Sequence, residues 1–148
     1  MIGRSKRERG SGQALVEFSV VLIPFLFLLM GVIDIGRGIY MYNGVSQAAR
    51  ELARTTSVHP CAADPCVLGT SAQTAQTLAT QRGLVPGLAA PSATVTYACT
   101  TITNTPVAGS CKGEFVAVQV TVPFTAITPL LSMVAPATLS STSHVEIP

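Results

Sequence analysis

The sequence predicts an α+β protein in which one long N-terminal helix crosses a membrane and continues into a small extracytoplasmic domain. Three observations indicate this arrangement: an apolar run near the N-terminus, a helical pattern after it, and β-branched segments nearer the C-terminus. We divide the chain into a basic leader peptide (1–12), a helix (13–58) and a small α+β domain (59–148) with a short helix and an antiparallel sheet.

The apolar run extends from Ala14 to Ile33 and contains only two polar side chains, Glu17 and Ser19. A helix of this length rises about 30 Å, the thickness of the hydrocarbon core of a bilayer. The basic residues before it are Arg4, Lys6, Arg7 and Arg9. Positive charge gathers on the cytoplasmic side of a span. We therefore expect a single-span protein in membrane lipid, with its N-terminus in the cytoplasm and its C-terminal domain outside.

A cleaved secretory signal is the alternative interpretation of a basic and then apolar start. Its apolar stretch would be about 7 to 15 residues long, with a small-x-small cleavage site directly behind it. Here the charged segment from Asp34 to Arg37 follows the run instead. We therefore favour a membrane span.

An acidic residue within a span indicates function, because a buried carboxylate is costly. Glu17 is only about 5 Å into the run by helix rise, so its carboxylate could also simply reach the lipid headgroups. It belongs to the motif GQALVEF, from Gly12 to Phe18, which resembles the processing site of type IV prepilins and more closely that of the Flp subclass. The resemblance implies that a membrane-embedded prepilin peptidase cuts between Gly12 and Gln13. Glu17 and Phe18 would then serve assembly, with the Glu17 carboxylate pairing with the new amino group of a neighbouring subunit.

Two further motifs follow the span: DIGR, from Asp34 to Arg37, and AARELAR, from Ala48 to Arg54. With the QALVEF start they resemble the TadE-like family, pilin-like minor subunits of the tight adherence (Flp pilus) assembly machinery. The resemblance covers about residues 10–58. Its motif residues here are Asp34, Gly36, Arg37, Asn43, Ala49, Arg50, Glu51 and Arg54.

The resemblance implies a pseudopilin or minor pilin-like protein of the bacterial inner membrane, either incorporated in a pilus or held at its base. Its partners would be the prepilin peptidase, other pilin-like subunits and pilus assembly proteins. The alternative function is an uncleaved, single-span binding module with an extracytoplasmic tip.

The residues after the span also predict a helix by their periodicity. An apolar stripe at spacings of three and four should pack against another surface. Its members are Ile35, Ile39, Tyr42, Val45, Ala49, Leu52 and Thr56. Away from this stripe we expect a solvated face on which Glu51 and Arg54 pair. We also expect Asp34 and Arg37 to pair with each other at the outer membrane edge.

Glycines in this helix indicate a close approach by a neighbouring helix, because they otherwise weaken helical structure. They are Gly36, Gly38 and Gly44. Pro60 ends the helix.

All four cysteines lie in the exported part of the chain, where an even number predicts disulfides. Three connectivities are possible, and we favour Cys61 with Cys66 and Cys99 with Cys111. A metal site made from His59, Cys61 and Cys66 is the less favoured alternative, because it lacks a fourth ligand nearby in the sequence.

A capping box at 70–73 predicts a short helix that ends at Gly83. We expect its small apolar face to pack on a sheet; the face is formed by Ala72, Ala75, Leu78 and Ala79.

Two strands are predicted over 93–103 and 114–122 by their β-branched, alternating residues. A third strand is expected over 139–147 and a short helix over 130–134. Turn residues lie between the first two strands, and Pro123 should end the second. The turn residues are Asn104, Pro106 and Gly109.

Catalysis has little support in the sequence. Neither His59 nor His144 belongs to a recognisable catalytic motif, and no phosphate loop or nucleophile elbow is present. We expect no enzyme activity, metal or cofactor. The basic residues gather in the leader, so we expect no nucleic-acid binding.

Overall fold

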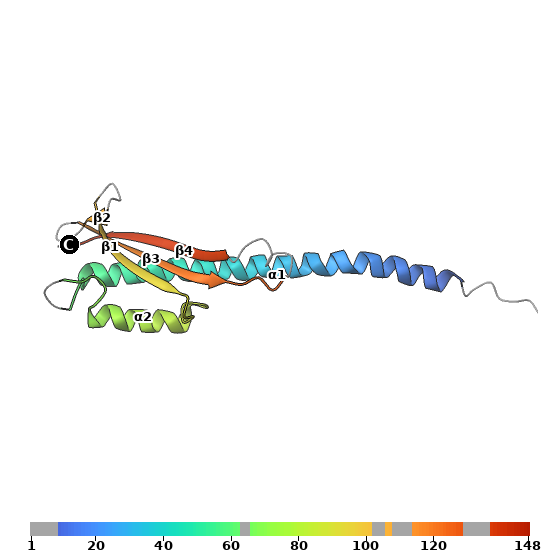
Figure 1. Cartoon of the computed structure of the whole chain (residues 1–148), viewed down its shortest axis with the longest axis horizontal. Helices are drawn as coiled ribbons and strands as arrows, with labels where there is room; N and C mark the ends of the chain where they lie inside the picture. Colours follow the sequence, from blue (N-terminus) through green and yellow to red (C-terminus); the bar gives the residue numbers. More distant parts are fainter. Residues whose placement is uncertain (1–8, 63–65, 102–105, 108–113, 129–136) are drawn as a thin grey trace, which may run out of the picture.

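The computed structural model describes residues 9–62, 66–101, 106–107, 114–128 and 137–148 (Figure 1). One helix, α1, runs from Arg9 to Val58 without a break. It ends just before Pro60, with the His59 N–H donating to the Thr55 carbonyl at 2.9 Å. The N-terminal half of α1 stands alone, and its C-terminal half is covered by the sheet and by the helix α2 (Figure 1).

The sheet is antiparallel, with strand order β2-β1-β3-β4. Its strands are β1 (Thr94–Thr100), β2 (Pro106–Val107), β3 (Phe115–Phe124) and β4 (Ala137–Glu146). The two strands predicted from β-branched alternation are present as β1 and β3, the third expected strand is β4, and the α+β fold is confirmed. The predicted helix over 130–134 lies outside the described residues.

Two prolines behave differently from the prediction. Pro106 was expected in a turn, but it belongs to β2 and pairs with Thr100 of β1. Pro123 was expected to end β3, but it pairs with Thr138 of β4. The pairing of β3 with β1 already ends at Thr121, so Pro123 borders only one strand and its missing N–H is tolerated there.

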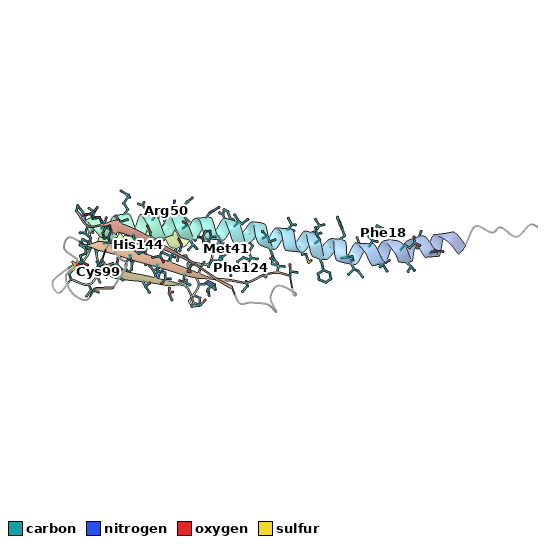
Figure 2. All side chains as sticks on the ribbon, turned by 90° about the horizontal axis from the view of Figure 1, so that it is seen from above. Phe18, Met41, Arg50, Cys99, Phe124 and His144 are labelled. Atoms are coloured by element: carbon teal, nitrogen blue, oxygen red, sulfur yellow. A yellow bond between two sulfur atoms is a disulfide. The ribbon has the colours of Figure 1, made fainter. Side chains whose placement is uncertain are left out.

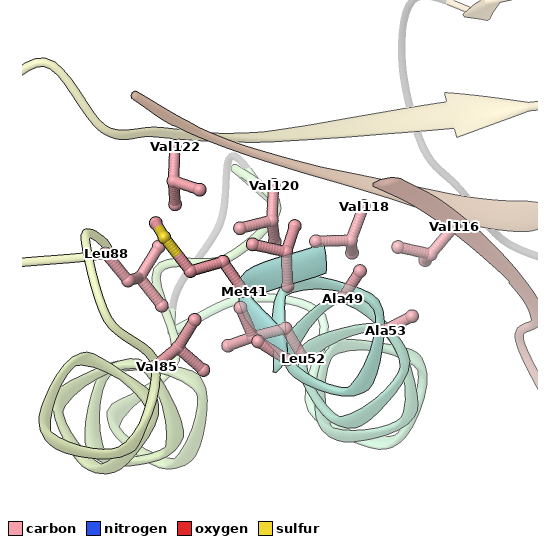
Figure 3. Packing of buried hydrophobic residues seen from close by; sticks show 12 residues of the cluster. Met41, Ala49, Leu52, Ala53, Val85, Leu88, Val116, Val118, Val120 and Val122 are labelled. Carbon is pink, nitrogen blue, oxygen red and sulfur yellow. The ribbon is translucent and has the colours of Figure 1, made fainter. Parts of the chain in front are cut away.

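The core lies between the C-terminal half of α1 and the inner face of β3 (Figure 3). Figure 3 shows Ala49 and Ala53 of α1 facing Val116 and Val118 of β3. Small alanines allow the helix to approach the sheet closely, while larger side chains fill the rest of the core. These are Met41, Val45, Leu52, Val85, Leu88, Val120 and Val122. The helix that forms the apolar N-terminal run therefore also forms half of the tip's core.

The predicted apolar stripe of α1 is right only in its second half. Val45, Ala49, Leu52 and Thr56 are all fully buried. Ile35, Ile39 and Tyr42, by contrast, are 61%, 58% and 49% exposed. In this part of the helix the buried positions are Asp34 and Met41, so the buried face begins on a polar residue that a search for apolar periodicity passes over.

The three glycines of α1 have different surroundings among the described residues: Gly44 lies against the end of α2, whose C-cap is Val85, and Gly38 lies against β3. A methyl group on Gly44 would lie 3.3 Å from Val85, and one on Gly38 would lie 3.6 Å from Phe124 of β3. Gly36 has open space around it.

Helix α2 runs from Ala72 to Leu84, with Ser71 as its N-cap. It packs against α1, where the Thr55 and Thr77 hydroxyl oxygens lie 3.3 Å apart. Its buried residue is Thr74. Of the expected face, Ala72, Ala75 and Ala79 are exposed, whereas Leu78 is half-buried against the core cluster. The prediction of sheet packing was wrong because alanine suits an exposed helix surface as well as a buried one. Gly83 lies inside the helix and does not end it.

The predicted disulfide between Cys61 and Cys66 is present, with its Cα atoms 5.2 Å apart. It joins two residues five positions apart in the segment after α1. Both sulfur atoms of the alternative metal site are therefore already bonded. Cys99 is also disulfide-bonded; Cys111, its expected partner, lies outside the described residues.

Candidate functional site

The first described turns of α1 carry the predicted processing and assembly residues. Gly12 lies in helical backbone, and a methyl group added there would meet nothing within 4 Å. The Gln13 side-chain amide donates to the Glu17 carboxylate at 3.2 Å, on the exposed surface. Phe18 is 62% exposed (Figure 2). Nothing in the described structure covers this segment, so all four residues remain open to a neighbouring molecule.

The rest of the apolar run is equally bare. Only 6% of its most apolar window is buried, whereas the core helix of a soluble protein would be mostly buried. Large apolar side chains are exposed from Leu15 to Ile33. α1 is thus a helix long and apolar enough to cross a membrane, and its surface is suited to lipid or to other apolar helices.

Asp34 is the first residue after this run, and it binds the segment that follows β3. Its carboxylate accepts hydrogen bonds from the Ile127 N–H at 3.0 Å and the Thr128 N–H at 2.8 Å. The Thr128 hydroxyl donates a third, at 2.5 Å. Asp34 is only 3% exposed. Three donors therefore compensate the removal of this carboxylate from water.

Arg37 lies one turn further along α1 and binds the same segment. Its guanidinium donates to the Thr125 carbonyl at 2.9 Å and lies 5.3 Å from the centroid of the Phe124 ring. Asp34 and Arg37 do not form the expected ion pair, because both side chains turn toward residues 124–128, although the charge of Arg37 still helps to lower the pKa of Asp34. We call these two residues and the segment they hold the DIGR clasp.

The clasp makes the stability of the tip depend on pH. The Thr128 hydroxyl and the two backbone N–H groups hold the pKa of Asp34 below its ordinary value of 3.8, with burial opposing them. A carboxyl group with a depressed pKa stabilises the folded state above its ordinary pKa, and this contribution is lost as the pH falls through the lower folded value.

We expect Asp34→Asn to lower the melting temperature of the full chain in detergent at neutral pH, because the amide cannot accept all three hydrogen bonds. The difference in melting temperature from wild type should begin to narrow below pH 3.8, where Asp34 of the unfolded chain takes up a proton, and should disappear only once the pH falls below the lower pKa of the folded state. Melting curves followed by circular dichroism across this range measure both effects. The matched control is Glu51→Gln, which removes a partly exposed carboxylate from a surface ion pair with Arg54 and should change little. Equal losses from the two variants would contradict the role of the clasp.

The AARELAR motif divides between the core and the surface. Ala49 is fully buried, whereas Arg50 is exposed. Glu51 and Arg54 form the predicted pair, with Nη2 and Oε1 2.8 Å apart. Arg50 has no described ion-pair partner among the residues that the structure covers.

These exposed motif residues line an open groove of about 800 Å³ between α1 and the end of α2. The residues of α1 that line the groove are Tyr40, Asn43, Gly44, Gln47, Arg50, Glu51 and Arg54. From α2 and the residues after it come Gln81, Leu84, Val85 and Pro86. The sequence predicted only a solvated face of α1 that includes Glu51 and Arg54. The contribution of α2 was not predicted, because it depends on how the two helices pack.

The two histidines were the other residues considered for catalysis or metal binding. His59 and His144 are both exposed. Among the described residues, no three His, Cys, Asp or Glu side chains come together as metal ligands.

The bare apolar helix, the clasp and the groove all involve residues of the motifs that suggested a family. Residues 12–54 match the family model described as TadE-like protein. No curated protein and no solved structure matches the chain. The matched segment begins at Gly12 and ends at Arg54, the last arginine of AARELAR, and the resemblance of residues 12–54 to the TadE-like family is thereby confirmed.

Proposed function

We propose that this chain is a pilin-like component of Flp (tight adherence) pilus biogenesis, held in the bacterial inner membrane by α1, with its N-terminus in the cytoplasm and its tip outside. The observation that carries the proposal is the TadE-like match over residues 12–54, a segment whose first half is uncovered and apolar. The role is structural rather than enzymatic, because the surfaces described suit assembly with other proteins.

In this proposal a prepilin peptidase cuts after Gly12 and leaves Gln13 as the first residue. The lack of any contact around Gly12 supports access by a protease. Cleavage also removes the basic leader, which would otherwise hold the helix at the cytoplasmic face. Other pilin-like subunits would then pack against the exposed apolar surface of α1.

Glu17 is the docking residue of the proposal. Within one chain its only described partner is the Gln13 side-chain amide, in an exposed contact of little strength. In an assembly, the carboxylate could instead pair with the terminal amino group of a neighbouring subunit in a medium of low dielectric. Breaking such a pair leaves an uncompensated charge, which is strongly destabilising.

We expect Glu17→Gln to be cleaved normally but to be recovered with other pilus assembly proteins at about a tenth of the wild-type level or less. Cross-linking in cells, followed by co-isolation from membranes, measures this. The matched control is Ser19→Ala, since the described hydrogen bond of the Ser19 hydroxyl goes to the Leu15 carbonyl of its own helix, at 2.7 Å. The control should assemble like wild type. Normal assembly of Glu17→Gln would mean that the carboxylate merely reaches the headgroups.

A further inference from the structure

We propose that the segment after β3 forms a second contact with the membrane, in which the side chain of Ile127 enters the outer leaflet beside the span. The inference goes beyond the proposed pilus function, and it rests only on α1 being a membrane anchor.

The DIGR clasp sets the height of this segment above the bilayer. Asp34 directly follows the apolar run, and its carboxylate holds the Ile127 N–H at 3.0 Å. The Ile127 backbone is therefore at the level where α1 leaves the hydrocarbon. Arg37 is about 4.5 Å further along the helix axis and holds the Thr125 carbonyl. From Thr125 to Ile127 the chain thus descends toward the membrane.

Ile127 has an apolar and exposed side chain, as a contact with lipid at this level requires. It is 61% exposed, although Thr128, the next residue, is buried. A single exposed isoleucine is ordinary on a soluble surface. At the outer edge of a span, however, an exposed branched apolar side chain lies where lipid can remove it from water.

The neighbouring polar groups also suit a lipid boundary. The Asp34 carboxylate already accepts three hydrogen bonds, so near lipid its oxygens would keep their hydrogen-bond donors. The Arg37 guanidinium lies over the Phe124 ring. Long basic side chains and aromatic rings are both suited to the interface between membrane and water, where they contact the lipid headgroups. The lipid surface is therefore the occupant that this end of the tip fits.

The chain contains no tryptophan, so single tryptophans can report depth. Ile127→Trp tests the contact. Phe27→Trp reports the span, and Val67→Trp reports the far end of the tip. Val67 is 59% exposed and belongs to the loop that returns to Pro60, about 40 Å along the helix axis from Asp34. Thr125→Trp is a second reporter one helical turn above Ile127, in case Ile127→Trp does not fold.

Each full-length variant is placed in phosphatidylcholine vesicles with or without bromine on the acyl chains, which quenches tryptophan fluorescence. We expect strong quenching of Phe27→Trp, clear quenching of Ile127→Trp with blue-shifted emission, weaker quenching of Thr125→Trp and none of Val67→Trp. If Phe27→Trp is quenched but the Ile127 and Thr125 reporters behave like Val67→Trp, the anchor stands and the second contact is wrong. If Phe27→Trp is not quenched, both are wrong. Blue-shifted but unquenched emission from Ile127→Trp would show that protein covers this side chain, and would also overturn the inference.

Discussion

Replacing Leu52 with alanine is expected to lower the free energy of unfolding of the tip by about 3 kcal/mol, within a usual range of roughly 2 to 5 kcal/mol. Leu52 is fully buried and belongs to the cluster between α1 and β3 (Figure 3). The substitution loses apolar burial and leaves a cavity that neighbouring strands and helices cannot easily fill. Guanidinium unfolding of the full chain in detergent measures the loss.

Leu84→Ala is the matched control, because it removes the same atoms from a side chain that is 66% exposed. It should change the stability by about 0.5 kcal/mol or less. A similar small change from Leu52→Ala would contradict the conclusion that the second half of α1 forms the core of the tip.

Replacing Gly69 with alanine is expected to cost at least about 2 kcal/mol. Gly69 has φ +80°, a conformation that alanine adopts only at a cost of about 1 to 2 kcal/mol. A methyl group there would also lie 2.6 Å from Cδ2 of the Tyr97 ring. That ring belongs to β1 and packs against the core cluster, so it cannot simply turn away.

Two comparisons separate the backbone effect from the clash. Gly83→Ala lies inside α2 with nothing within 4 Å, and should stabilise the helix by roughly 0.5 to 1 kcal/mol. In a Tyr97→Ala background, Gly69→Ala should lower the free energy of unfolding only by the contribution of the backbone conformation, about 1 kcal/mol. An equal cost with and without the ring would show that the contact with Tyr97 is unimportant.

The local features of the fold were predictable from the sequence. The apolar run, the β-branched strands and the pair Glu51–Arg54 each depend on residues that are near one another in the chain. The Cys61–Cys66 disulfide closes a short loop, which also made it accessible to prediction. Short-range spacing is sufficient for such features.

The clasp was not predictable in this way. Asp34 binds Ile127 and Thr128, which lie 93 and 94 positions further along the chain, and no rule of sequence spacing predicts such a contact. The buried face of α1 was misjudged for the same reason, since Asp34 is buried only because those distant donors compensate its charge. The groove beside Arg50 likewise depends on where α2 packs, and the alanines of α2 gave no reliable direction.

The N-terminal residue of the protein recovered from membranes tests the central proposal most directly. The full chain is produced with and without a prepilin peptidase, and its N-terminus is identified by intact mass and N-terminal sequencing. Gly12→Val is the informative variant, because the added side chain begins in open space and should leave the fold unchanged. We expect a chain that begins at Gln13 when the peptidase is present, and a retained leader in Gly12→Val. A chain that still begins at Met1 beside an active peptidase, whichever residue occupies position 12, would contradict the proposal and favour an uncleaved, membrane-anchored binding module.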